Sequence, residues 1–263
     1  MRIEPGTRAL VTGASRGIGR ATAGALAGRG ARVGLLSRSE GELASLAAEL
    51  PGDPVVLVAD VGDADSVAGA VERFVAEAGG LDLAVANAGI AHYGPFRDLP
   101  IERAEELVHI NLLGTLYTVN AALPPMLDRA NGHLVIVASG AALRSFPGGA
   151  TYGATKAGQR AFAEALRHEL SGTGVSVTIV YPGEVKTHLH DHELDRMPDW
   201  YRRDDAISPE RVAEAIVKGV EEDRRHVHVP PLVRALALNS VAPRLTDRLL
   251  ATLRGPAAAP RRD

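Results

Sequence analysis

The chain has 263 residues, of which 46% are hydrophobic and 23% charged, values typical of a soluble globular protein and a length that one α/β domain can reach. Its 29 Lys and Arg residues against 32 Asp and Glu residues give a formal net charge of -3, which argues against a nucleic-acid partner. The chain contains no cysteine, which excludes disulfides, a thiolate nucleophile and cysteine-ligated metal centres.

The first ten residues carry Arg2, Glu4 and Arg8 in place of an apolar signal-peptide core, and no 18 uncharged apolar residues are consecutive. We therefore expect a cytoplasmic protein.

Short apolar segments alternate with longer segments of helical periodicity. The segments predicted as buried strands are residues 8–12, 32–36, 55–59, 81–86, 134–138 and 175–181. The helices predicted between them are residues 17–28, 40–50, 63–78, 101–129 and 151–171. Nearly continuous apolar strands that alternate with helices are typical of a parallel sheet covered on both faces, so the pattern predicts a doubly wound, Rossmann-type α/β/α fold.

The C-terminal part departs from this alternation. Residues 184–207 are rich in His, Asp, Arg and Met, which predicts a lid. Ser208 and Pro209 predict a helix that ends near residue 222, and residues 226–229 are predicted to form a last strand. We expect a single domain over residues 1–254 and a disordered tail over residues 255–263.

A basic segment ends the chain. Residues 223–263 contain eight arginines and three acids, and leucines recur at near-helical spacing at positions 245, 249, 250 and 253. This pattern predicts a helical segment over about residues 231–254 that packs against the parent domain or a second subunit. Peripheral contact with an anionic membrane is the alternative.

The segment after the first predicted strand has the composition of a dinucleotide-binding loop. Its glycines permit unusual backbone angles and let a pyrophosphate approach a helix N-terminus. The predicted contact residues are Gly13, Ser15, Arg16, Gly17, Ile18 and Gly19. The spacing is Gly-x-x-x-Gly-x-Gly instead of Gly-x-Gly-x-x-Gly, so a turn that only packs a helix on a strand is the alternative.

The end of the second predicted strand carries no acid. Ser37 stands where an NAD-binding fold usually places an acid against the adenosine ribose. Arg38 follows it, and together with Arg16 it offers guanidinium groups to a 2′-phosphate. These residues favour NADP(H) over NAD(H), and two ordinary solvated arginines are the alternative.

Further motifs follow the later strands. Asn87-Ala-Gly89 follows the fourth strand, Ser139 follows the fifth, and Tyr152-Gly-Ala-Thr-Lys156 opens the next helix. With the glycine loop, these motifs resemble the short-chain dehydrogenase/reductase family over roughly residues 5–187. The main local departure is Ala138-Ser139-Gly140, where many members have paired serines.

The resemblance implies a set of site residues and an assembly. The implied catalytic residues are Asn111, Ser139, Tyr152 and Lys156. The further implied cofactor contacts are Asp60, Val61, Asn87, Gly89, Tyr152, Lys156, Pro182, Gly183, Val185 and Thr187. The helices that carry Asn111 and Tyr152 resemble those through which family members form homodimers and homotetramers.

The expected chemistry is hydride transfer between a nicotinamide and a carbonyl or secondary alcohol, with Tyr152 as acid or base. A phenol has a reference pKa of about 10. Lys156 lies one helical turn away, and an ammonium at about 4 Å contributes roughly 4 kcal/mol at an effective dielectric of about 20. We therefore expect Lys156 to lower the pKa of Tyr152 by about three units.

The other two implied catalytic residues have supporting roles. Ser139 is expected to hold the substrate oxygen by a hydrogen bond. For Asn111 the resemblance implies a helix kink and a water-mediated proton path to Lys156, while a helix-bending polar residue is the alternative.

The predicted function is NADP(H)-dependent reduction of a small ketone or aldehyde. The alternatives are an NAD-dependent alcohol, sugar or steroid dehydrogenase, or a nucleotide-sensing protein without turnover. We expect no metal, because the alternating histidines 188, 190 and 192 lie in an irregular lid and need not share a face. The candidates for the substrate pocket are His92, Tyr93, Arg144, Phe146, Trp200 and Tyr201.

Overall fold

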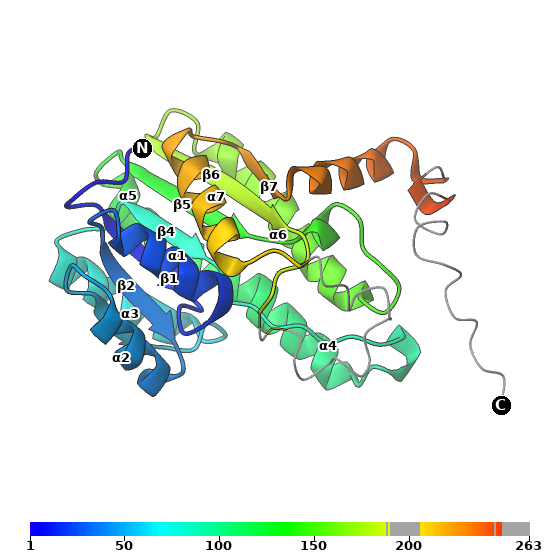
Figure 1. Ribbon diagram of the computed structural model, residues 1–263, viewed down its shortest axis with the longest axis horizontal. Helices are drawn as coiled ribbons and strands as arrows, with labels where there is room; N and C mark the ends of the chain where they lie inside the picture. The colour runs from blue at the N-terminus through cyan, green and yellow to red at the C-terminus, as the bar shows by residue number, and fades with distance from the viewer. Residues whose placement is uncertain (188, 190–205, 245, 249–263) are drawn as a thin grey trace.

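The computed structural model describes residues 1–187, 189, 206–244 and 246–248. These residues contain a seven-stranded parallel sheet with the strand order β3-β2-β1-β4-β5-β6-β7 (Figure 1), which confirms the predicted doubly wound fold. The strands are β1 (Arg8–Thr12), β2 (Arg32–Ser37), β3 (Val55–Val58), β4 (Leu83–Ala86), β5 (Gly132–Val137), β6 (Val175–Pro182) and β7 (His226–Val229).

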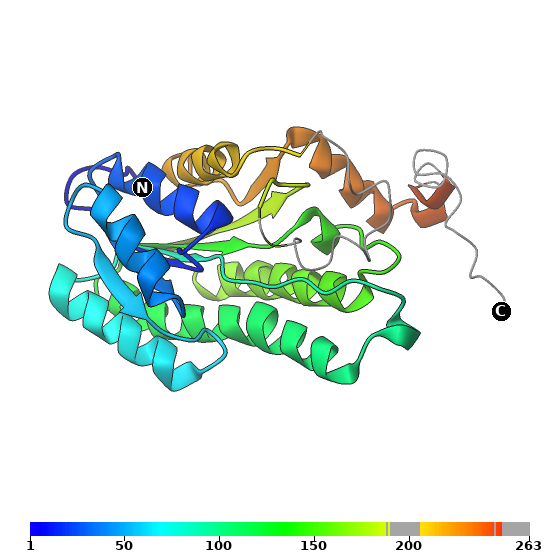
Figure 2. The ribbon, with the colours of Figure 1, turned by 60° about the horizontal axis from the view of Figure 1, so that its bottom comes forward.

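Helices cover both faces of the sheet (Figure 2). One face carries α1 (Gly17–Ala27), α2 (Glu40–Glu49) and α7 (Pro209–Glu221). The other face carries α3 (Ala64–Ala78), α5 (Gly114–Leu127) and α6 (Ala150–Glu169), and α4 (Ile101–Leu107) leads into α5.

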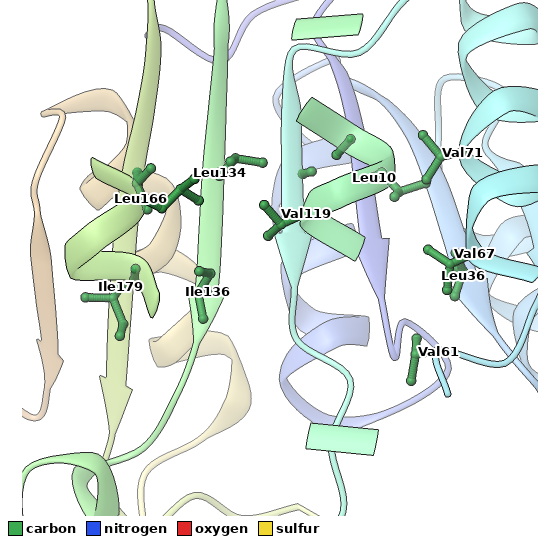
Figure 3. Packing of buried hydrophobic residues seen from close by; sticks show 14 of the residues in the cluster. Leu10, Leu36, Val61, Val67, Val71, Val119, Leu134, Ile136, Leu166 and Ile179 are labelled. Atoms are coloured by element: carbon green, nitrogen blue, oxygen red, sulfur yellow. The ribbon is translucent and has the colours of Figure 1, made fainter. Parts of the chain in front are cut away.

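The core consists of two apolar layers, one on each side of the sheet. Successive residues of a strand point to opposite faces, so Leu10 packs in the layer under α3, α5 and α6, whereas Val11 packs in the layer under α1, α2 and α7. Figure 3 shows part of the first layer, with Leu166 of α6 beside Leu134 of β5 and with Ile136 of β5 and Val119 of α5 in the same cluster. Burial on both faces explains why the strands are continuously apolar.

The strand order places the functional loops. β1 lies between β2 and β4, so the chain leaves β1 toward one edge of the sheet and returns on its other side. The loops that follow β1 and β4 diverge at this point, and ligands of doubly wound sheets bind in the crevice that forms there.

The helix predicted over residues 101–129 is interrupted. α4 ends at Leu107, and a π-helical turn, η2 (Val108–Leu113), precedes α5. The turn contains Asn111, which is fully buried. π-Helical turns inside α-helices occur frequently at functional sites, and the apolar periodicity of the segment carries no sign of one.

The described part of the C-terminal segment packs against the loop after β5. Its 3₁₀ helix, η6 (Pro231–Ser240), places Leu236 and Val233 beside Gly140, while Leu232, Leu238 and Val241 are exposed. The predicted contact with the parent domain is thus present, whereas most of the predicted lid, the leucines at 245, 249, 250 and 253, and the tail lie outside the described residues. Among the described helices, none has the length and apolar character that a membrane crossing requires.

Candidate active site

A groove of about 960 Å³ crosses the carboxyl ends of the strands. Nearly all the predicted site residues line it: Gly13, Ser15, Arg16, Gly17, Ile18, Ser37, Arg38, Asp60, Val61, Asn87, Gly89, Ser139, Tyr152, Lys156, Pro182, Gly183, Val185 and Thr187. The two exceptions are Gly19 and Asn111, which contact lining residues: a Cβ on Gly19 would lie 2.6 Å from Asn87 Nδ2, and Asn111 Oδ1 accepts from the Ile90 N–H. The structure therefore brings the glycine loop and the predicted catalytic residues Ser139, Tyr152 and Lys156, which are distant in the chain, into one cavity.

The glycines of the loop after β1 have no space for a side chain. Gly13 has a φ of +65°, and a Cβ there would lie 2.9 Å from the Cα of Ala88. A Cβ on Gly19 would overlap the carbonyl oxygen of Gly13. Arg16 stands at the N-cap of α1, and neither a side-chain cap nor an acid occupies the first turn. Since the first N–H groups of a helix have no partners within it, this end of α1 is suited to an anion such as a pyrophosphate.

Asn87 ties the loop after β4 to the loop after β1. Its Nδ2 donates to the carbonyl oxygen of Thr12 at 2.9 Å, and the backbone N–H groups of Asn87 and Ala88 donate to Thr12 Oγ1 at 3.0 and 3.1 Å. These bonds hold the two loops of the crevice in register.

The outer end of the groove is charged and exposed. An Arg38 guanidinium nitrogen lies 3.6 Å from Asp60 Oδ2, and the two side chains are 66% and 42% exposed. Asp60 Oδ1 also accepts a hydrogen bond from the Gly62 N–H at 2.9 Å. Residues of α1 and α2 that the sequence did not single out, Arg20, Glu42 and Ser45, line the same end.

The inner end of the groove is buried. Tyr152 is 5% exposed and Lys156 is 4% exposed, and their spacing of four residues places them on one face of α6. The Lys156 Nζ donates to the Val137 carbonyl oxygen at 3.2 Å and lies 5.8 Å from the centre of the Tyr152 ring. Ser139 hydrogen-bonds Tyr152, and its Oγ also accepts from the Ala141 N–H at 3.1 Å.

The pKa of Tyr152 differs in direction from the expectation. Burial raises it to about 12, and the hydrogen bond from Ser139 opposes only part of that rise. Burial also lowers the pKa of Lys156 to about 8. The expected lowering by about three units is wrong for the protein groups alone, because the removal of the phenolate from water dominates the shift of the pKa. Tyr152 is therefore a protonated phenol at neutral pH.

Asn111 holds the loop after β4 against α6. Its Oδ1 accepts from the Ile90 N–H at 2.8 Å, and its Nδ2 donates to the Ile90 carbonyl oxygen at 3.0 Å and to Thr155 Oγ1 at 3.2 Å. Both N–H donors and one acceptor position of the side-chain amide are thereby engaged within the protein. The Asn111 carbonyl oxygen accepts from Thr115 and Gln159, two residues that the sequence did not single out.

The candidates for the substrate pocket divide into two groups. The rings of Tyr93 and Phe146 lie 5.8 Å apart, and Tyr93 is edge-on to Tyr152 at 5.8 Å. In contrast, His92 bonds Glu106 at 3.0 Å and Arg144 pairs with Asp247 of the C-terminal segment. Ile90 and Leu189 add an apolar lining, while Trp200, Tyr201 and the histidines at 188, 190 and 192 lie outside the described residues. Within the described residues, no three His, Asp or Glu side chains are grouped as a metal site.

A doubly wound sheet with a glycine loop in its crevice defines a Rossmann-type protein. The family model for short chain dehydrogenases matches residues 7–197, so the chain belongs to the short-chain dehydrogenase family.

Relatives agree with this assignment. A protein of Myxococcus xanthus described as an uncharacterized oxidoreductase is 43% identical over 219 residues, 81% of this chain and 85% of the relative. A short-chain dehydrogenase/reductase of Burkholderia phymatum solved with NAD has the same fold, with a TM-score of 0.84 over 98% of this chain and 99% of that one at 24% identity. An alcohol dehydrogenase of Thermococcus sibiricus solved with 5-hydroxy-NADP has a TM-score of 0.74 over 84% and 94% of the two chains at 30% identity.

Proposed function

We propose that this protein is an NADP(H)-dependent oxidoreductase that reduces a small ketone or aldehyde to an alcohol, with Tyr152 as general acid. The observation that carries the proposal is the burial of Tyr152 and Lys156 side by side at the inner end of the same groove that contains the glycine loop. The oxidoreductase name of the Myxococcus relative and the alcohol dehydrogenase activity named for the Thermococcus structure support the reaction class.

The residues present fit a dinucleotide. The uncapped N-terminus of α1 would hold the pyrophosphate. The glycines before it have no space for a Cβ, so no larger residue can replace them without a shift of their neighbours. Arg16 and Arg38 would hold a 2′-phosphate by charge-assisted hydrogen bonds. The solved relatives bind NAD in one case and an NADP derivative in the other, so the preference for NADP(H) depends on these arginines and on Ser37 at the end of β2.

The cofactor supplies the hydride that reduces the carbonyl carbon. Tyr152 donates its phenolic proton to the carbonyl oxygen, and Ser139 holds that oxygen by a hydrogen bond. The ammonium of Lys156 stabilises the phenolate that remains. Because burial raises the pKa of Tyr152 to about 12, the phenol carries the proton that reduction needs at neutral pH, whereas oxidation would first require its deprotonation. This favours reduction.

The proposal also includes the oligomeric state of the protein and its location in the cell. We expect residues 1–254 to act as one catalytic domain, in the cytoplasm, as a homodimer or homotetramer built through α5 and α6.

The test is a panel of ketones and aldehydes assayed by the loss of NADPH absorbance, with the wild type, Tyr152→Phe and Tyr181→Phe compared. Tyr181→Phe is the matched control, because it removes a buried phenol whose partner is His226 on β7. We expect Tyr152→Phe to lower kcat by roughly 10²- to 10⁴-fold, to leave the Kd for NADPH within a few-fold, and Tyr181→Phe to retain kcat. Turnover by Tyr152→Phe at the wild-type rate would contradict the proposal, and NADPH binding without turnover of any carbonyl would favour a nucleotide-sensing protein.

A further inference from the structure

A fully buried glutamine lies beside the candidate catalytic residues. Gln159 follows Tyr152 by seven residues and Lys156 by three, which places all three on the same face of α6. Its Nε2 donates to the Asn111 carbonyl oxygen at 2.8 Å and contacts Thr115 Oγ1 at 2.6 Å. The orientation of the amide follows from these partners, because the opposite one would place two carbonyl oxygens against each other.

The other half of this amide is unsatisfied. Gln159 Oε1 is buried and has no hydrogen-bond partner among the described residues. A buried acceptor without a partner is unfavourable, and a leucine of similar size would avoid that cost. Stability alone therefore does not account for a glutamine at this position, which suggests that its N–H groups serve the site.

The contacts of Asn111 lead from Gln159 to the groove. Gln159 holds the backbone of Asn111, and the side chain of Asn111 binds Ile90 in the groove wall and Thr155 on α6. Thr155 Oγ1 in turn donates to the Tyr152 carbonyl oxygen at 2.7 Å. Three of these bonds run from α6 through η2 back to the first turn of α6, and the fourth joins Asn111 to the loop after β4.

The same network borders Lys156. A Cβ built on Gly89 would lie 3.1 Å from Asn111 Oδ1 and 3.6 Å from the Lys156 Nζ, so Asn111 and Lys156 flank the same glycine of the groove wall. A shift of Asn111 would therefore change the groove wall at Gly89, next to Lys156.

We propose that Gln159 is a positioning residue for proton transfer: by holding the Asn111 carbonyl oxygen it fixes the π-helical turn, and with it the relative placement of Tyr152, Lys156 and the loop after β4. This inference rests on the function proposed above. It assigns Gln159 no contact with substrate or cofactor.

Gln159→Leu separates positioning from stability. We expect it to keep or raise the Tm, because an unsatisfied acceptor is removed, and to lower kcat by about tenfold through misplacement of the reacting groups. The pH dependence of kcat should shift, and amide hydrogen exchange over Val108–Leu113 should become faster. Thr22→Val is the matched control, since Thr22 Oγ1 is another buried atom without a partner among the described residues, on α1 outside this network; it should keep the wild-type kcat, pH profile and exchange rates.

Two further variants keep the test decisive if Gln159→Leu does not fold. Thr115→Val weakens the hold on the same carbonyl oxygen and should lower kcat in the same direction by a smaller factor. Gln159→Glu can donate to that oxygen only while protonated, so its kcat should approach the wild-type value at low pH and fall as the pH rises. A wild-type kcat, pH profile and exchange rate in these variants would overturn the inference alone, whereas a wild type without turnover would overturn the proposed function as well.

Discussion

The two ends of the groove differ in their exposure to water. At the outer end, Arg38 and Asp60 are largely exposed and 3.6 Å apart, so water and salt weaken their attraction. At the inner end, Tyr152 and Lys156 are almost fully buried. Burial raises the pKa of Tyr152 and lowers the pKa of Lys156, so it favours the neutral form of each side chain. Substitutions at the inner end should therefore change the rate by orders of magnitude, whereas those at the outer end should change only the choice of cofactor.

Among substitutions that leave Tyr152 in place, the largest effect is expected from loss of the buried cation. In the proposed reaction, Lys156→Met removes the charge that would stabilise the phenolate left after proton donation, and we expect kcat for NADPH-linked reduction to fall by roughly 10²- to 10³-fold. Steady-state and single-turnover kinetics measure this fall in kcat. Lys218→Met, which removes an exposed lysine of α7, is the control and should leave kcat unchanged. A Lys156→Met enzyme within threefold of the wild type would contradict the contrast between the two ends.

A third region tests whether burial alone can shift a pKa in this protein as strongly as it does at the inner end of the groove. His133 lies at the start of β5, at the end of the strand away from the groove, is 1% exposed, and bonds Thr178 Oγ1 at 2.8 Å. Burial lowers its pKa to about 4. Between about pH 6.5 and pH 4 the unfolded chain binds more protons than the folded one, so stability falls as the pH falls through this window, by roughly 3 kcal/mol in all.

His133→Gln keeps a donor for Thr178 and removes the titration. Urea unfolding at pH 7 and pH 5 should show a loss of stability in the wild type that is about 2 kcal/mol larger than in the variant. His168→Gln, which removes an exposed imidazole of α6, should behave as the wild type. An equal acid loss in the wild type and His133→Gln would show that burial acts less strongly than the inner end of the groove requires.

The sequence was sufficient to predict the strands and many of the residues that line the groove, although Arg20, Glu42 and Ser45 were not singled out. Buried parallel strands are continuously apolar, and ligand contacts follow their carboxyl ends, so the position of Asp60 or Ser139 in the chain indicates its place in space. The same reasoning located β7, whose bounds agree with the prediction.

Features that depend on tertiary packing were not predictable in this way. A spacing of four residues places Lys156 near Tyr152, but the sign of the pKa shift depends on how much water remains at the phenol. The π-helical turn has the same apolar pattern as an α-helix, so only Asn111, for which the resemblance implied a helix kink, indicates an irregularity there. The signal that was overlooked is Gln159, a polar side chain on the buried face of a helix, one turn after Lys156.

The smallest effect is expected at the outer end. An exposed ion pair such as Arg38–Asp60 contributes about 0–1 kcal/mol, so Arg38→Ala should not alter the Tm. It should weaken NADPH binding by about tenfold, because a charge-assisted bond to the 2′-phosphate is lost, and leave NADH binding within twofold. Arg38→Asp should go further and reverse the preference.

Calorimetric titration of both cofactors at low and high salt measures this effect. The advantage of NADPH over NADH in the wild type should shrink as salt screens the arginine and the phosphate from each other. Arg73→Ala, which removes an arginine with an exposed acidic partner on α3, controls for the change in net charge and should bind both cofactors as the wild type does. If Arg38→Ala weakens NADH and NADPH equally, Arg38 contacts a part common to both dinucleotides, and the preference for NADP(H) has no basis at this end of the groove.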